Sequence, residues 1–535
     1  MTERMDHADL RNRLQKLNAI GIALSAQTDI AQLIEMILNT ARELVNADAG
    51  TVYLQRDDQL QFELVMTGSR NLHWGGTSPI RAHIPALPLK LADGQPNLAN
   101  VAAAAVNLDK TINIADAYTA EGYDFSGTRQ FDERLGYRSR SFLSVPLRNH
   151  DGAALGVLQL INAQDEDGNS IAFSVDDQQL VESLASQAAI AINNRQLINA
   201  LEELFEAFIG IINMAIDDKS PYTSAHCQRV PELTLMLADA VCQADYGPLA
   251  GFAMSAADRY ELKIAGLLHD CGKITTPVHV VDKATKLQTI FDRIDLIDTR
   301  FEVLLRDAEI AHLKGEMDLA SWQQTREQIH ADRAFLRHTN RGVEAMSDAD
   351  IARVQAIAQR TLSVDGQRLA LLSADEAENL SVRRGTLTRA ERDIINHHID
   401  VTIQMLASLP WPRHLQRVPE FAGGHHERMD GKGYPLGLTR EQMSVQARIM
   451  GLADVFEALT AKDRPYKQGM PLSQALAIMA RMARDQHIDA DLYEVFLRQQ
   501  VWLAYAQQFL DADQVDAVDT ASLLALARSP RPQPS

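Results

Sequence analysis

The fold of the C-terminal half is decided by one short stretch, Leu267-Leu-His-Asp-Cys-Gly-Lys-Ile274. The apolar residues before it recur at helical spacing: Leu262, Ala265 and Leu268. Gly272 is a natural helix stop, so the sequence predicts that His269 and Asp270 lie on the last turn of a buried helix. Such a helix end can turn an imidazole and a carboxylate toward one ion, and the two oxygens of Asp270 could bridge two ions. Taken alone, however, a His-Asp pair is more often a capping or surface pair.

More side chains of the metal-ligand type occur in the same half, each beside helical or glycine-rich sequence: His226, His398, His425, His426 and Asp454. Together with His269 and Asp270 they form a nitrogen and oxygen set without a thiolate, which favours iron or manganese and leaves zinc open. Seven ligands are too many for one ion that must leave room for a substrate. We therefore expect two divalent ions. The adjacent His397 is the rival of His398 for one ligand position.

His269-Asp270 with Lys273, His425-His426 and Gly433-Tyr434-Pro435 resemble the HD-GYP branch of the HD phosphohydrolases. The resemblance covers roughly residues 205–510 and implies an all-α domain over residues 205–515, here with a helical insertion at about 284–388. It implies one metal held by His226, His269, Asp270 and Asp454. It implies a second metal held by His398, His425 and His426, with Asp270 bridging and His397 left on the surface. Some members bind a third metal through a glutamate four residues before the first histidine, but that position is Tyr222 here.

By the same resemblance, the expected activity is hydrolysis of cyclic di-GMP to pGpG, GMP or both. Asp270 and Lys273 would be catalytic, and Gly433, Tyr434 and Pro435 would form part of the substrate site. Arg464 and Lys467 match the positions that grip the second phosphate, although Arg464 could instead cap the preceding helix. Two alternatives stay open: hydrolysis of another nucleotide or cyclic dinucleotide, and a non-catalytic adaptor that retains the metals. Family analogy also suggests GGDEF-domain proteins as partners.

The N-terminal half mixes strand and helix signals. A helix is expected over residues 17–44 with a break near 27–29, where Thr28 or Asp29 could cap its second part. Asp151-Gly152 between two β-rich runs predicts a hairpin. Three strings in residues 20–195 resemble a GAF domain, an α/β sensory module built on an antiparallel sheet: Gly136-Tyr-Arg-Ser-Arg-Ser-Phe-Leu-Ser-Val-Pro-Leu147, Gly156-Val-Leu-Gln-Leu-Ile-Asn162 and Phe173-Ser-Val-Asp-Asp-Gln178.

The ligand of this module is not evident. Asn162, Phe173 and Asp177 fit the pattern of GAF domains that bind cyclic nucleotides, but Ala163 and Gln178 replace its lysine and glutamate. The resemblance therefore does not support cyclic-nucleotide binding. A GAF domain that only dimerises is nearly as well supported as one that senses a ligand.

A signalling linker is expected between the two halves, over residues 196–216. Its apolar residues are spaced 4-3-4-3-4: Leu197, Leu201, Leu204, Phe208, Ile211 and Ala215. This spacing is that of a coiled-coil seam and predicts a parallel homodimer. The alternative is a helix that packs only on its own domain. The flanking segments are expected to be an N-terminal helical piece (1–19) and a C-terminal tail (516–535) with a disordered end.

Composition limits the class of partner. The 52 Lys and Arg against 71 Asp and Glu give a formal net charge of −19, which argues against nucleic acid or an anionic lipid surface as the partner. Three cysteines without a Cys-x-x-Cys pair argue against a disulfide scaffold. The start of the chain is charged and no apolar run is long enough for a membrane span, so we expect a multidomain, cytoplasmic protein.

Overall fold

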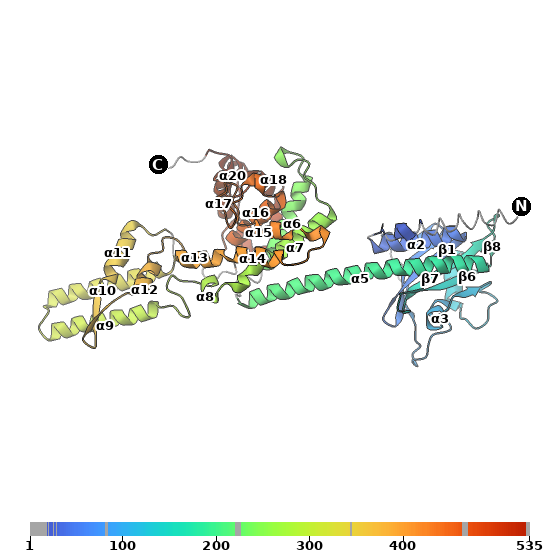
Figure 1. Cartoon of the computed structure of the whole chain (residues 1–535), viewed down its shortest axis with the longest axis horizontal. Helices are drawn as coiled ribbons and strands as arrows, with labels where there is room; N and C mark the ends of the chain where they lie inside the picture. Colours follow the sequence, from blue (N-terminus) through green and yellow to red (C-terminus); the bar gives the residue numbers. More distant parts are fainter. Residues whose placement is uncertain are drawn as a thin grey trace. The chain divides into compact units, whose positions relative to one another are not determined.

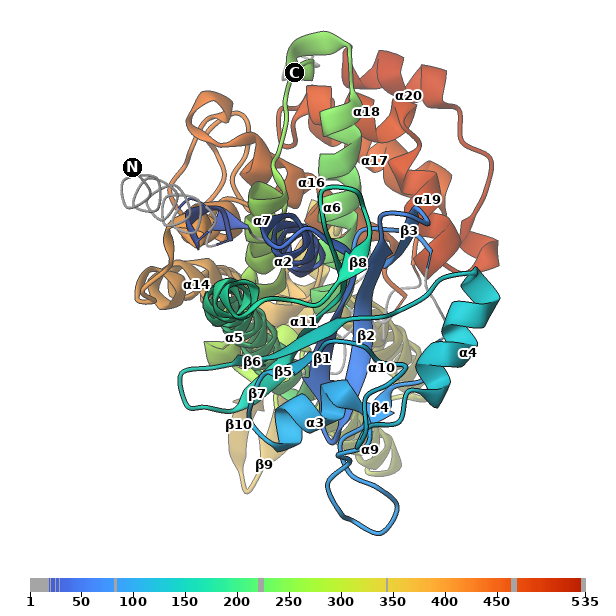
Figure 2. The same ribbon diagram turned by 90° about the vertical axis from the view of Figure 1, so that its right-hand side faces the viewer.

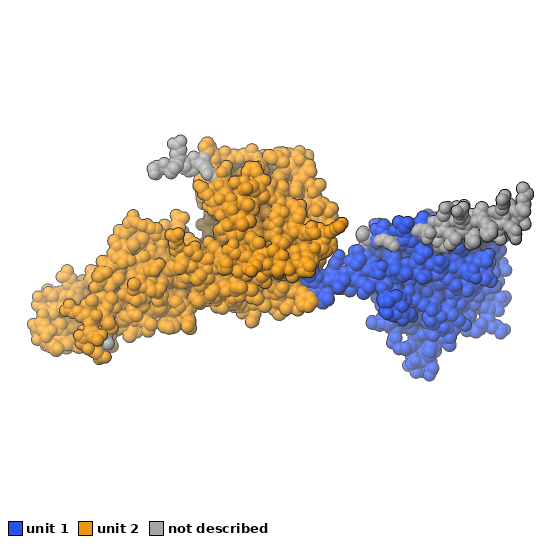
Figure 3. All heavy atoms as spheres, in the orientation of Figure 1, with its two compact units in different colours: residues 1–205 blue, residues 206–535 orange. Residues whose placement is uncertain are grey.

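The computed structural model describes residues 19–530 apart from 20, 25, 28, 81–83, 220–225, 343–344 and 463–468. The chain forms two compact units, residues 1–205 and 206–535 (Figure 3). Arg464, Lys467, Tyr222, Thr28 and the expected N-terminal segment up to residue 18 lie outside the described residues, as do the last five residues of the chain. No helix in the described ranges is both long enough and apolar enough to cross a membrane.

The first unit is built on an antiparallel sheet in the order β3-β2-β1-β7-β6-β5, with β4 pairing to β2 and β8 to β7. The expected hairpin at Asp151-Gly152 is confirmed, because it joins β6 to β7 and Gly152 has a φ of 82° that favours glycine. The strands are β1 (Ala47–Arg56), β2 (Gln59–Thr67), β3 (Leu72–Gly75), β4 (Leu87–Pro88), β5 (Ile112–Ile114), β6 (Phe142–Arg148), β7 (Ala154–Gln164) and β8 (Ser170–Ile171).

Side chains alternate between the two faces along each strand, so both faces of this sheet carry apolar residues, and helices cover both of them. Val52 and Leu158 belong to the face packed under α2 (Ile30–Leu44) and α5 (Val175–Lys219), which Figure 2 shows on one side of the sheet. Tyr53 and Val157 pack instead with the alanines of α3 (Val101–Asn107). Asp29 caps α2 by accepting from the Gln32 N–H, as one of the two expected alternatives. A further helix, α4, spans Ser126–Leu135. This architecture confirms the expected antiparallel sheet with packed helices.

Helix α5 is 45 residues long and continues from the first unit into the second. One of its sides is used internally: Ile192 is buried in the first unit, and Ile209 and Ile216 are buried in the second. The residues of the 4-3-4-3-4 spacing lie elsewhere on the helix and are exposed, Leu201 by 64% and Leu204 by 54%. The helix therefore carries a second apolar side that the described part of its own chain leaves uncovered.

The second unit is largely helical, as expected. Its first half contributes α6 (His226–Gln243), α7 (Ala256–Leu268), the 3-10 turn η2 (Cys271–Thr275) and α8 (Val278–Val281). Its second half contributes α13 (Arg389–Asn396), α14 (His398–Ala407), α15 (Val418–Gly423), α16 (Val445–Thr460), α17 (Leu472–Arg484), α18 (Ala490–Arg498), α19 (Val501–Phe509) and α20 (Thr520–Ala527) (Figure 1). Helix α20 lies in the stretch expected only as a tail and packs on α17, with Leu523 and Ala527 buried.

The insertion between the two halves has an apolar core of its own, which includes Phe301, Leu336 and Leu380. Helices α9 (Ile294–Leu313) and α10 (Leu319–Asn340) lie side by side and are followed by α11 (Asp348–Ala358) and α12 (Ala374–Leu380). A short hairpin, β9 (Thr361–Val364) with β10 (Gln367–Ala370), was not expected in an all-α domain. Asp365 and Gly366 form its turn, both with positive φ, which is the Asp-Gly signal that also marks the hairpin of the first unit.

Candidate metal centre

The seven ligand-type residues lie on different helices of the second unit, mostly at helix ends. His226 and His398 are the first residues of α6 and α14, His269 follows α7 directly, and Asp454 lies within α16. His425 and His426 follow α15, whose C-cap is Gly424. Helices that pack with their ends together thus bring residues separated by more than 200 positions to one point.

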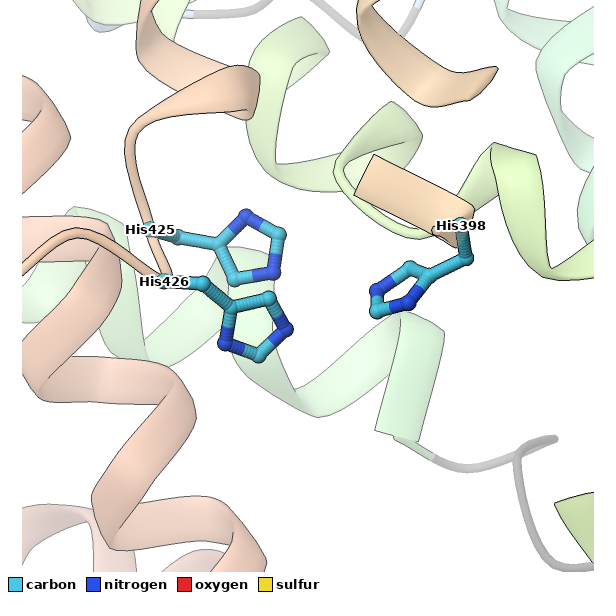
Figure 4. Close-up of side chains that lie close together, drawn as sticks. All are labelled: His398, His425 and His426. Atoms are coloured by element: carbon cyan, nitrogen blue, oxygen red, sulfur yellow. The ribbon is translucent and has the colours of Figure 1, made fainter. Parts of the chain in front are cut away.

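The structure brings the seven residues into three overlapping groups whose ligand atoms lie within 4.8 Å of one another. One group is His226, His269 and Asp454, another is His269, Asp270 and His425, and the third is His398, His425 and His426. Figure 4 shows the third group, in which the rings of His425 and His426 face that of His398 from the opposite side. These groups contain all the side chains that the resemblance assigned to the metals.

Asp270 lies between the groups and directs one oxygen to each side. Its Oδ2 is 3.2 Å from His226 Nε2 and 3.3 Å from His269 Nε2. Its Oδ1 is 3.2 Å from His398 Nε2. A carboxylate in this position can bind one cation through each oxygen, which is the geometry expected of a bridging ligand.

Backbone carbonyls fix the tautomer of three histidines. His269 Nδ1 donates to the Gly266 carbonyl at 2.7 Å, His425 Nδ1 donates to the Ala422 carbonyl at 2.6 Å, and His398 Nδ1 donates to the Ile395 carbonyl. Each acceptor lies three residues earlier, in the last turn of a helix, where a carbonyl has no partner four residues further along the same helix. With the proton held on Nδ1, the lone pair of Nε2 is available to a metal.

The donor set fits divalent cations. Asp270 Oδ1, His398 Nε2 and His425 Nε2 are buried atoms that have no hydrogen-bond partner among the described residues. Leaving such atoms unpaired costs free energy unless a ligand satisfies them. Imidazole nitrogens and carboxylate oxygens are suitable ligands for iron, manganese or zinc. The residues present therefore fit the metal sites expected from the sequence.

The electrostatics of the protein groups match this assignment. Burial would raise the pKa of Asp270, but Lys273 and His269 outweigh it and hold the pKa well below its usual value. Asp454 is likewise held ionised, because contact with His226 lowers its pKa more than burial raises it. Burial and neighbouring imidazoles lower the pKa of His425, and burial lowers that of His426 to about 4. His226 is the exception, because burial would lower its pKa but its contacts with Asp270, Asp454 and Glu457 outweigh burial and raise the pKa well above its usual value. Metal binding requires anionic carboxylates and neutral imidazoles, so His226 must give up a proton when it binds a metal, whereas His425 and His426 are already neutral.

The Gly-Tyr-Pro segment lies directly against the histidines. The Tyr434 ring stacks on the His426 ring, with centroids 4.8 Å apart and planes inclined by 22°. Gly433 must be glycine, because a Cβ there would lie 2.4 Å from the backbone of Glu427 and Arg428. The buried Glu427 carboxylate accepts hydrogen bonds from the N–H groups of Leu436, Gly437 and Leu438 and so closes the loop.

Other candidates from the sequence are placed as follows. Lys273 Nζ lies 2.5 Å from Asp270 Oδ2, inside the centre. The His397 side chain is 67% exposed and faces Asp400, in contrast to the buried His398. The structure does not describe the phosphate-gripping candidates Arg464 and Lys467.

Gly272 has a different role from the helix stop predicted from the sequence. The helix ends at Leu268, four residues before it, and Gly272 lies inside the 3-10 turn η2. A Cβ at Gly272 would lie 2.0 Å from the His398 carbonyl oxygen. The glycine is therefore required by the close approach of α14, which carries His398.

Sequence reasoning missed Glu457, Arg229 and Glu427. Glu457 follows Asp454 by three residues and Arg229 follows His226 by three, so both share a helix face with a ligand. Glu427 follows His426 directly. The helical spacing was a usable signal for the first two, whereas the loop contacts of Glu427 could not be read from spacing.

Comparison with known proteins agrees with this organisation. A GAF domain model matches residues 29–192, and two models described as HD domain match residues 223–361 and 371–492. The chain thus combines an N-terminal GAF domain with a C-terminal HD region that is homologous to cyclic di-GMP phosphodiesterases of the HD-GYP type.

Curated relatives match over short segments. The chain is 43% identical over 95 residues to a 3′3′-cGAMP-specific phosphodiesterase of Vibrio cholerae, covering 18% of this chain and 20% of the relative. It is 36% identical over 114 residues to a cyclic di-GMP phosphodiesterase of Pseudomonas aeruginosa, covering 21% and 26%. Among solved structures, the GAF domain of a Coxiella burnetii phosphoenolpyruvate-protein phosphotransferase is 18% identical, covers 36% of this chain and 98% of that one, and has a TM-score of 0.28.

Proposed function

We propose that this protein is a metal-dependent phosphodiesterase that hydrolyses cyclic di-GMP to pGpG, GMP or both. The observation that carries the proposal is Asp270, whose two oxygens face two separate groups of imidazoles in one buried centre. That arrangement suits two divalent ions, of which iron and manganese are the favoured candidates. Two bound ions would supply a metal-activated water and neutralise the charge that grows on the phosphoryl oxygens.

The chain's own residues have distinct proposed roles around this centre. Asp270 would hold both ions, and Lys273, which lies beside it, would present a fixed cation to the phosphoryl oxygens. The loop with Gly433, Tyr434 and Pro435 would contact the substrate, since Tyr434 already lies on a ligand ring. Arg464 and Lys467 remain our candidates for the second phosphate of the substrate. The phosphate group of the bond to be cut would thus lie beside the two ions and Lys273.

A second substrate is supported by the relatives. Three of those with significant similarity are named 3′3′-cGAMP-specific phosphodiesterases, with 43%, 42% and 35% identity over their matched segments. The two cyclic dinucleotides differ in one base, so a metal centre that cuts one backbone can cut the other. Base contacts would then decide which of the two is preferred.

The decisive experiment uses the full chain loaded anaerobically with Fe(II) or Mn(II). The protein is incubated with cyclic di-GMP and, in parallel, with 3′3′-cGAMP, and the linear dinucleotide and mononucleotide products are resolved by chromatography. The Asp270→Asn variant, purified in the same way, controls for contaminating enzymes. Metal-loaded protein that cleaves neither substrate would refute the proposed activity and favour the non-catalytic adaptor.

Two further parts of the proposal concern regulation and assembly. We propose that the GAF domain regulates the HD region in response to a ligand of unknown identity. We also propose a parallel homodimer through the exposed apolar side of α5, because its other side already packs on its own two units. GGDEF-domain partners and a cytoplasmic location remain predictions.

A further inference from the structure

One of the five histidines of the centre, His226, is held differently from three of the others. His269, His398 and His425 follow a helical turn and donate through Nδ1 to a carbonyl three residues earlier. His226 opens α6, as His398 opens α14, but its Nδ1 has a different partner. Its Nδ1 lies 2.5 Å from Oε2 of Glu457, a side chain of another helix. A carboxylate thus takes the place that a backbone carbonyl has for those three imidazoles.

Two helices supply this contact through matched spacing. On α16, Glu457 lies three residues after Asp454, so both carboxylates are on the side of the helix that faces α6. His226 touches both of them, because its Nε2 is 3.3 Å from Asp454 Oδ1 while its Nδ1 meets Glu457. The ring is therefore held between one carboxylate at the centre and one behind it.

A cation balances the rear carboxylate. Arg229 lies three residues after His226 on α6, and its Nε and Nη2 are 2.8 Å and 2.6 Å from Glu457 Oε1. The Glu457 side chain is only 1% exposed, so its charge needs a buried partner. The two oxygens of Glu457 therefore contact different side chains, since Oε1 pairs with Arg229 and Oε2 meets His226.

We propose that Glu457, held by Arg229, is a positioning residue that keeps the Nδ1 proton of His226 in place and so directs Nε2 to a cation shared with His269, Asp270 and Asp454. The inference rests on the proposed metal centre, but it does not depend on which phosphodiester is cut. The competing explanation is a salt bridge that only ties α6 to α16. That explanation predicts a loss of folding stability without an effect specific to one ion.

The test measures Mn(II) affinity of the full chain by equilibrium dialysis and elemental analysis, without any nucleotide. Glu457→Gln keeps the shape of the side chain but has one acceptor oxygen for two donors. Loss of an outer carboxylate on a metal-bound histidine typically weakens metal binding about 10- to 100-fold. We expect that loss for one of the two ions. Glu376→Gln is the matched control, because Glu376 is also a buried carboxylate paired with an arginine, Arg300, but lies in the insertion.

Background variants locate the effect. In His398→Ala protein the remaining ion is held by the His226 group, and Glu457→Gln should weaken it by the same 10- to 100-fold. In His226→Ala protein the imidazole that Glu457 holds is gone, and Glu457→Gln should leave the affinity for the remaining ion unchanged. Equal losses in both backgrounds, or unchanged affinity in the wild-type background, would overturn the proposal.

A second variant covers the case in which Glu457→Gln does not fold. The pair Arg229→Gln with Glu457→Gln removes both buried charges together, so no charge is left without a partner. We expect this protein to fold and still to lose affinity for one ion. If the pair binds both ions as tightly as the wild type, Glu457 is only structural. Wild-type protein that binds two ions but cleaves no cyclic dinucleotide would refute the proposed function and leave this inference standing.

Discussion

Substitution of Gly272 by alanine tests how closely the metal centre depends on packing. The new Cβ would lie 2.0 Å from the His398 carbonyl oxygen and 2.7 Å from both the backbone nitrogen and Oγ1 of Thr402. Contacts below 3.0 Å are essentially never adopted by a real Cβ, so the start of α14 must retreat by about 1 Å. His398 is the first residue of that helix and must move with it.

A displacement of this size exceeds what a metal site accepts, since ligand distances hold to about 0.2 Å. We therefore expect Gly272→Ala to lose the ion that we propose for His398, His425 and His426. Overpacking of this kind typically costs about 1–3 kcal/mol, which for a unit as large as residues 206–535 corresponds to a fall in Tm of roughly 1–5 °C. Elemental analysis of Mn(II)-loaded protein measures the first effect, and thermal unfolding followed by circular dichroism measures the second.

The matched control is Gly210→Ala. Gly210 lies inside α5, and a Cβ there meets nothing within 4 Å. Alanine is the better helix former, so this variant should keep both ions and gain up to about 1 kcal/mol of stability. If Gly272→Ala retains both ions at wild-type affinity together with the wild-type Tm, the claim that the approach of α14 positions His398 is wrong.

Substitutions at four other places in the chain have equally specific expected outcomes. Asp270→Asn should abolish turnover and metal retention together, because the amide replaces one of the two oxygens by an NH2 group and removes the negative charge between the two sides of the centre. An active, fully metallated variant in the cleavage assay would contradict the bridging role. Charged substitutions at Leu201 and at Leu204 should each shift the protein from dimer to monomer in sedimentation, whereas Glu203→Lys on the same helix should leave it dimeric. If both leucine variants stay dimeric like the control, the exposed side of α5 is not the dimer interface. Arg464→Ala should lower kcat/KM for cyclic di-GMP by roughly 10- to 150-fold but should hardly change the hydrolysis of bis(p-nitrophenyl) phosphate, which has no second phosphate. Equal losses of kcat/KM on both substrates would show that Arg464 does not bind the second phosphate. Burial lowers the pKa of Lys286 to about 8, so between pH 8 and 10.5 the unfolded chain binds more protons at this residue than the folded chain does. The free energy of unfolding of the wild type, relative to that of Lys286→Met, should therefore rise with pH over this range by at most about 1.4 kcal/mol per pH unit. If urea unfolding gives the same difference across that range, the lowered pKa is wrong.

The sequence by itself determined much about the local structure and chemistry of this protein. Asp151-Gly152 between two β-rich runs was sufficient for a hairpin, because Gly152 adopts the positive φ that the turn needs. The nitrogen and oxygen character of the ligand-type residues was sufficient to predict candidate metal ligands, since ligand chemistry depends on residue type; iron or manganese as the metal stays a prediction. The 3.5-residue repeat of the linker was sufficient to predict that its apolar residues lie along one side of a helix, and the structure shows this side exposed.

Only the tertiary structure decided which residues share a site. His226 and Glu457 are 231 positions apart and touch because α6 packs on α16, a contact that no local pattern encodes. Gly272 was predicted as a helix stop from local propensity, whereas the approach of α14 is what requires a glycine there. The two sides of Asp270 likewise became distinct only once three helix ends had met around it. Residue types fix what chemistry a side chain can perform, but its partners depend on long-range packing, because contacts between distant segments form only when the helices assemble around a common core.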